Sequence, residues 1–178
     1  MNTNETTEPL VEAAFVGLQG MRGLRRSADM RPVMFGELVH YVHGTAQVDD
    51  ARLCEQLSTN LSLRHQFMVL LEKSRIAIAP AQAQAASKEL LSLRETRAFT
   101  LKFKPSNADS EQVYVLLTVH PESGLADGYS PILLATKGAE VGRLCFPLLT
   151  DQRAQLLLVE GDHRLALLRE PDTEVSLV

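Results

Sequence analysis

The spacing of hydrophobic residues changes along this chain near residue 96. Before that point apolar residues recur three and four positions apart, as on one face of a helix. After it, short apolar runs alternate with Gly, Pro, Asp and Asn. Helices followed by strands predict an α+β protein, in which a small helical domain precedes an antiparallel β-sandwich or barrel-like domain. We expect four parts: a partly helical arm over 1–31, a helical domain over 32–78, a helical linker over 79–96 and a β domain over 97–178.

The pattern in the first half predicts three short amphipathic helices. Gly44 is well placed as the left-handed residue that ends the first helix. Thr45 is expected to cap the second, with Asp49 and Asp50 in its first turn, and the third is expected to run from about residue 61 to 75. Such short helices are not stable alone in water, so their apolar stripes must pack on one another or on a partner. The stripes contain Phe35, Leu38, Val39 and Val42, then Leu53 and Leu57, then Leu63, Phe67, Leu70 and Leu71.

The pattern in the second half predicts β-strands. Residues 99–103 alternate between apolar and polar, whereas 113–119 form a continuous apolar run that is rich in β-branched residues. Closely spaced strands are typical of an antiparallel sandwich or barrel. Further strands are expected over 131–136, 141–146, 155–159, 165–168 and 174–177.

Charge and composition argue against two classes of partner. The net charge is −4 and the pI is about 5.7, without the strongly basic character of a nucleic-acid-binding domain. The arginines at 22, 25, 26 and 31 lack interleaved aromatic residues on which bases could stack. No window approaches the ~18 uninterrupted apolar residues of a membrane span, and the acidic N-terminus lacks the order of a signal peptide. We therefore expect a cytoplasmic protein that contacts neither membrane nor nucleic acid.

The sequence has few signals for catalysis or metal binding. It contains no phosphate-binding loop, no dinucleotide fingerprint and no nucleophile elbow. His40, His43 and His65, with Cys54, form at most a weak metal-binding set, and solvated or packing histidines are the commoner case. Cys54 and Cys145 are expected to be small buried hydrophobes. We expect a protein without enzymatic activity, metal or cofactor.

Residues 35–75 resemble the helical anti-sigma domain of bacterial regulators of extracytoplasmic-function sigma factors. In that family an apolar helix ends in a Tyr-x-x-Gly step, which Tyr41 and Gly44 match, and an arginine opens the third helix, which Arg64 matches. Zinc-binding members place a histidine and two cysteines before this arginine. The corresponding positions here hold Gln56, Asn60 and Leu63, so the resemblance implies a zinc-free version.

The resemblance implies that the helices bind a sigma factor and hold it away from RNA polymerase. Each residue expected at the interface could instead belong to the core of the helical domain, because an apolar stripe serves either role. The expected partner-binding residues are Phe35, Leu38, Tyr41, Val42, Leu53, Leu57, Arg64, Phe67, Leu70 and Leu71.

The alanine-rich stretch after the third helix is a candidate for regulated release. A cleavage or hinge segment is expected around Ala79, Pro80, Ala81 and Ala85, with release by proteolysis or partner exchange. An alternative function is a non-enzymatic adaptor of a signalling or defence complex that docks through the β domain, for example on a protease or a sensor protein. A ligand sensor built on the sandwich is a weaker alternative, because the β half has no Trp.

Overall fold

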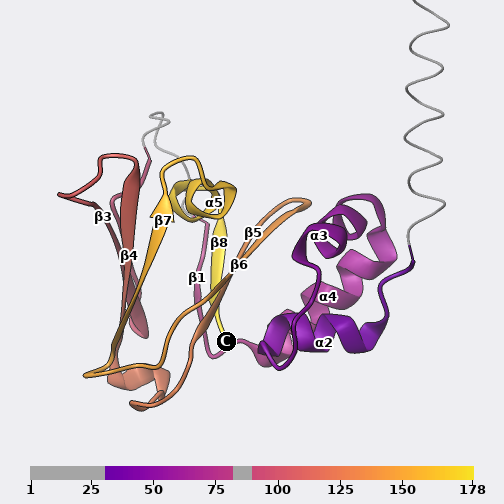
Figure 1. Cartoon of the computed structure of the whole chain (residues 1–178). Coiled ribbons are helices and arrows are strands. Elements are labelled where there is room, and N and C mark those ends of the chain that lie inside the picture. The colour runs from indigo at the N-terminus through magenta and orange to yellow at the C-terminus, as the bar shows by residue number, and fades with distance from the viewer. Residues whose placement is uncertain (1–30, 82–89) are drawn as a thin grey trace, which may run out of the picture. The chain divides into compact units, whose positions relative to one another are not determined.

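A computed structural model describes residues 31–81 and 90–178 of the chain (Figure 1). These residues form four helices, one 3₁₀ turn (η1, Pro121–Ser123) and two antiparallel sheets of four strands each. Val33–Val178 constitute one compact unit. The predicted arm over 1–31, apart from Arg31, lies outside the described residues, as does the stretch 82–89. None of the described helices has the length and apolar content needed to cross a bilayer.

Three helices of the first half confirm the sequence prediction. They are α2 (Phe35–His43), α3 (Asp50–Thr59) and α4 (Leu61–Ser74), and together they are called the helical layer. Gly44 ends α2 with a φ of 65°, as predicted. The cap of α3 is Asp49 rather than Thr45, because the Asp49 side chain accepts a hydrogen bond from the Arg52 amide at 3.0 Å. Asn60 ends α3 and also caps α4, by accepting from the Leu63 amide at 3.1 Å.

The strands form two sheets with the orders β1-β8-β5-β6 and β2-β3-β4-β7. All pairings are antiparallel, and every predicted strand except 165–168 is confirmed. The predicted division near residue 96 falls between two paired strands of one sheet, β2 and β3. The strands are β1 (Ala77–Ala79), β2 (Leu93–Glu95), β3 (Phe99–Pro105), β4 (Gln112–Val119), β5 (Ile132–Lys137), β6 (Glu140–Cys145), β7 (Arg153–Val159) and β8 (Glu174–Leu177).

Two segments differ from the sequence prediction. Residues 165–168 belong to a helix, α5 (His163–Arg169), which Asp162 caps by accepting from the Arg164 amide at 2.8 Å. An apolar run of this length fits a buried strand or a buried helix equally well, so its length does not distinguish the two. The helical-linker prediction over 79–96 is wrong at its described ends, because Ala79 closes β1 and Leu93–Glu95 form β2. Pairing with β8 and β3 overrides the helical preference of an alanine-rich sequence.

The described residues form two hydrophobic cores, one on each side of the sheet β1-β8-β5-β6. The sandwich core lies between the two sheets and includes Phe99, Val115, Leu133 and the leucines of α5. The second core lies between the helical layer and the outer face of that sheet (Figure 1). The sheet contributes to it Ile132, Leu134, Val141 and Val178, and the helical layer contributes its stripes.

Candidate functional site

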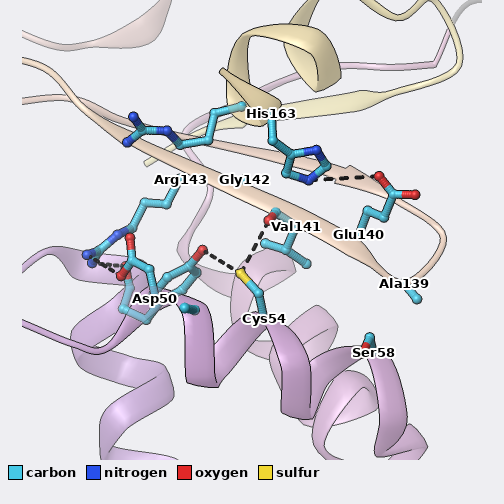
Figure 2. Close-up of a pocket in the computed structure, with 12 residues that line it drawn as sticks. Asp50, Cys54, Ser58, Ala139, Glu140, Val141, Gly142, Arg143 and His163 are labelled. Carbon is cyan, nitrogen blue, oxygen red and sulfur yellow. Dashed lines mark hydrogen bonds and ion pairs between the residues drawn. The ribbon is translucent and has the colours of Figure 1, made fainter. Parts of the chain in front are cut away.

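The best-defined pocket lies where the helical layer meets the free edge of β6. It has a volume of about 310 Å³ and lies between α3, β6 and the start of α5 (Figure 2). Its walls combine small or apolar residues with charged side chains. The residues that line it include Tyr41, Asp50, Ala51, Cys54, Ser58, Ala139, Glu140, Val141, Arg143, His163 and Arg164.

Arg143 on β6 joins the sheet to two helices at this pocket. Its Nη1 donates to the main-chain oxygen of Tyr41 at 3.1 Å, and its Nη2 pairs with the Asp50 carboxylate at 2.8 Å. The guanidinium carbon lies 4.5 Å from the centre of the Tyr41 ring, within cation–π range. The Arg143 side chain is largely buried, so these charge-assisted contacts form in a poorly solvated place.

Cys54 of α3 and Tyr41 of α2 line the side of the pocket that the helical layer forms. The Cys54 thiol donates to the Val141 carbonyl at 3.4 Å, and the Tyr41 hydroxyl lies 3.8 Å from Cys54 Sγ. Burial raises the pKa of the Cys54 thiol, and burial also raises the pKa of the Tyr41 hydroxyl. Both groups are therefore held in their neutral, protonated forms, which disfavours a thiolate nucleophile at this position.

The opposite wall comes from α5, which packs closely on β6. A Cβ atom at Gly142 would lie 3.2 Å from Leu167 Cδ1, so this position has little room for a side chain. His163 Nε2 lies 3.9 Å from a Glu140 carboxylate oxygen. The Arg164 guanidinium donates to Asp162, which lowers the pKa of the Asp162 carboxyl.

These contacts favour binding of a small apolar group over a catalytic role. The charged side chains of the pocket already have ion-pair partners, whereas Ala51, Ala139 and Val141 give it an apolar surface. No grouping of His, Cys, Asp and Glu that could hold a metal ion occurs among residues 31–81 and 90–178. No protein-family model, curated protein or solved structure matches the chain.

Most of the predicted partner-binding residues lie inside the molecule. Phe35 is 56% exposed, Leu70 is half-buried, and Arg64 is also partly accessible. The others form the core between the helical layer and the sheet. The buried ones are Leu38, Tyr41, Val42, Leu53, Leu57, Phe67 and Leu71.

The three residues that carry the family resemblance, Tyr41, Gly44 and Arg64, each contact another helix or strand of this fold. Arg64 donates from Nε to the Leu57 carbonyl at 2.9 Å and from Nη2 to the Ser58 carbonyl at 2.7 Å. It therefore satisfies carbonyls at the C-terminal end of α3. A Cβ atom at Gly44 would lie 2.5 Å from Ile132 Cδ1, so Gly44 permits close approach to β5 in addition to its left-handed φ. The Tyr41 ring lies beneath Arg143 of β6.

The positions that correspond to zinc ligands in the family that the sequence resembles have other roles here. The Gln56 side-chain oxygen accepts from the Val33 amide at 2.8 Å, Asn60 caps α4, and Leu63 is buried. The histidines do not converge: His40 Nδ1 lies 2.7 Å from the Thr45 hydroxyl, and His43 Nε2 lies 3.2 Å from the Ser74 hydroxyl.

The predicted release segment is only partly described. Ala79 is buried and pairs with Val175 of β8, whereas Pro80 and Ala81 are exposed, and Ala85 lies outside the described residues. The residue that sequence reasoning missed is Arg143. The sequence does hold a clue to it. Arg143 is two residues from the buried Val141 and so projects from the same face of β6, which makes it a charged residue on a covered face.

Proposed function

We propose that this chain is a non-enzymatic regulatory protein of the cytoplasm that binds a protein partner through its helical layer. The partner class that the sequence resemblance suggests is a sigma factor. Seven of the expected interface residues, those buried between the helical layer and the sheet, would then act by shaping the helical layer rather than by touching the partner.

The observation that carries the proposal is that the exposed side of α4 holds three apolar residues among the polar Ser62, His65, Gln66, Glu72 and Lys73. Leu63, Phe67 and Leu71 form its buried side. Its exposed side carries Leu61, Met68 and Val69, and Leu61 is 75% exposed. Leu61 and Met68 are seven residues apart and therefore lie on the same side of the helix, next to Val69, and apolar residues grouped in this way on a surface mark protein-binding sites. The outer side of α4 is therefore a surface suited to a helix of another protein.

Two further exposed apolar residues lie at the start of α2. Met34 is 59% exposed and Phe35 is 56% exposed, and they are consecutive in the chain. Phe35 is the expected interface residue that the structure leaves most accessible to a partner, and large aromatic residues are enriched among the residues that dominate binding energy.

Regulation follows by occlusion if the partner is a sigma factor. The helical layer would cover a surface with which the sigma factor contacts RNA polymerase, and so keep it inactive. Release would follow cleavage next to the exposed Pro80 and Ala81, or exchange for another protein.

Titration of the full chain with purified extracytoplasmic-function sigma factors from the encoding organism tests this proposal. We expect a one-to-one complex by calorimetry. The variants Leu61→Asp and Met68→Asp should each weaken it by at least about tenfold, because a charge enters an apolar contact. Leu157→Asp, on the exposed face of the other sheet, is the matched control and should leave the affinity unchanged. Absence of a complex, or a complex indifferent to both α4 variants, would contradict the proposal.

The second candidate function is an adaptor that docks through its sheet β2-β3-β4-β7. It is favoured by exposed apolar residues on that sheet, namely Leu93 on β2 and Leu157 and Val159 on β7. A partner whose capture is lost with Leu157→Asp and kept with Met68→Asp would support this function in place of the first.

A further inference from the structure

The strand β7 leaves its main-chain groups unpaired along one edge. The amide and carbonyl of Arg153 both bond to Thr150, away from β4, whereas the Gln152 carbonyl and the Glu160 amide bond toward the β4 side. Because these directions alternate along a strand, Gln155 and Leu157 also direct their N–H and C=O groups away from β4. No described residue bonds to these groups, so β7 is an open edge.

This edge lacks the features that usually prevent strand addition. Residues 154–159 contain no charge and no proline. Leu157 and Val159 project from the outer face, 46% and 57% exposed, and the side chains of Leu156 and Leu158 on the inner face are only partly buried. Natural sheets protect their edges with lysine, proline or a covering element, so an apolar, unprotected edge is typical of a strand that pairs with another chain.

A basic groove lies beside the edge on the outer face of the same sheet. It has a volume of about 710 Å³; Leu116 and Thr118 of β4 line it together with Lys102 of β3 and Arg153 of β7, and the exposed Leu148 borders it. Neither Lys102 nor Arg153, nor the neighbouring Lys104, has a carboxylate within ion-pair distance in the described parts of the chain. The groove therefore carries positive charge without compensation in a chain whose net charge is −4.

We propose that β7 and this groove bind an extended segment of a partner protein in which acidic residues alternate with apolar ones. The segment adds a strand to the sheet, with its main chain paired to Gln155 and Leu157. Side chains of one parity lie on the inner face beside Leu156 and Leu158, where apolar residues fit. Side chains of the other parity lie on the outer face, where carboxylates pair with Arg153 of the adjacent strand. Lys102 lies on the third strand away and contributes only to the positive potential of the groove.

Charge decides between this occupant and a second copy of the chain. A second copy would present its own β7, which has no carboxylate between Arg153 and Val159, so the cations of the groove would stay unpaired. An acidic segment supplies carboxylates to Arg153 and lowers the positive potential around Lys102. The inference deepens the second candidate function and is independent of whether the helical layer binds a sigma factor, because the two surfaces share no residue.

The test uses the full chain and a ten-residue peptide of alternating valine and glutamate, with the matching valine and lysine peptide as a control. We expect saturable binding of the glutamate peptide only, with slower hydrogen exchange at the Gln155 and Leu157 amides. Arg153→Glu should weaken binding about tenfold and Lys102→Glu by a smaller factor, because Lys102 acts only at longer range, and the double variant should prefer the lysine peptide. Lys73→Glu, an exposed charge on α4, is the matched control and should change nothing.

A glutamate peptide with N-methylated valines separates strand pairing from simple charge attraction without altering the protein. It should not bind, because its main chain lacks the donors that an added strand needs. Equal binding of the methylated peptide, no binding at millimolar peptide, or indifference to both charge reversals would overturn the proposal. So would dimerisation of the free chain that by itself protects the Gln155 and Leu157 amides, which would assign the edge to a second copy.

Discussion

The two sheets of this protein contain similar apolar runs but differ in how their outer faces are covered. In β5 every residue from Ile132 to Thr136 is buried, because the helical layer covers one face of the sheet and the sandwich core covers the other. In β4 buried residues alternate with half-buried ones, among them Tyr114 and Leu116. A continuous apolar run normally belongs to a strand covered on both faces. The comparison teaches that β4 has the sequence of a strand that is covered on both faces, whereas in the described residues only its inner face is covered.

Truncating one leucine in each sheet tests this comparison most directly. Leu134→Ala should lower the free energy of unfolding by about 4 kcal/mol, because Leu134 is fully buried between β5 and the helical layer. Leu116→Ala, on the uncovered face of β4, should cost less than about 1 kcal/mol. Urea unfolding of both variants provides the measurement. Equal losses would mean that the two faces do not differ in cover.

Arg94 tests a connection between the two sheets. It is on β2 but almost fully buried, and it donates to the carbonyls of Leu168 at 2.6 Å and Thr173 at 3.0 Å and also to that of Glu170. Burial lowers the pKa of its guanidinium. Arg94→Ala should cost about 3 kcal/mol, since it leaves these carbonyls without donors.

Arg97→Ala is the control for that variant. Arg97 is exposed three residues further along the chain and makes none of the contacts of Arg94. Thermal unfolding should show a lower Tm for Arg94→Ala and almost none of this change for Arg97→Ala. A similar Tm for both would show that the buried guanidinium does not hold the segment between α5 and β8.

Gly44 tests how closely the helical layer lies on the covered sheet. Gly44→Ala should destabilise the protein by about 2 kcal/mol, because the new Cβ meets Ile132 Cδ1 and the φ of 65° disfavours a side chain. Gly138→Ala has a similar φ of 59° with no atom within 4 Å, so it should cost only the conformational part, about 1 kcal/mol. Shortening Ile132 to valine should recover part of the difference, and chemical denaturation of the four proteins measures it.

The reactivity of the two cysteines tests the contact between the sheet and the helical layer, where Cys54 lies. Cys145 is exposed, whereas Cys54 donates to the Val141 carbonyl, so iodoacetamide at neutral pH should modify Cys145 at least about tenfold faster. Mass spectrometry of the labelled chain measures both rates.

The raised pKa of the Cys54 thiol also predicts a pH dependence. Its contribution to stability is complete below the ordinary thiol pKa of about 8.5 and is lost as pH rises toward the folded-state pKa. Unfolding curves of the native chain and Cys54→Ala should therefore converge above about pH 9. Stability curves that stay parallel through this range would show that the thiol is not shielded.

Local features of the fold could be predicted from the sequence, whereas long-range contacts could not. Gly44 and the alternation at 99–103 determine a helix end and a strand through neighbouring residues alone. The strand prediction over 165–168 is wrong because a short apolar run fits a strand or a helix, and only the cap at Asp162 distinguishes the two. The pocket depends on Arg143 meeting Tyr41 and Asp50 across most of the chain, and nothing in their spacing indicates that contact.

Asn60 serves as the last cap of α3 and the first cap of α4, so the two helices are joined without any intervening loop. The guanidinium of Arg64 reinforces the junction from the other side. The outer side of α4 is thereby presented at a fixed orientation before any encounter. A partner that bound there, as we propose, would meet a rigid template, so association would lose little additional conformational entropy on this side of the complex.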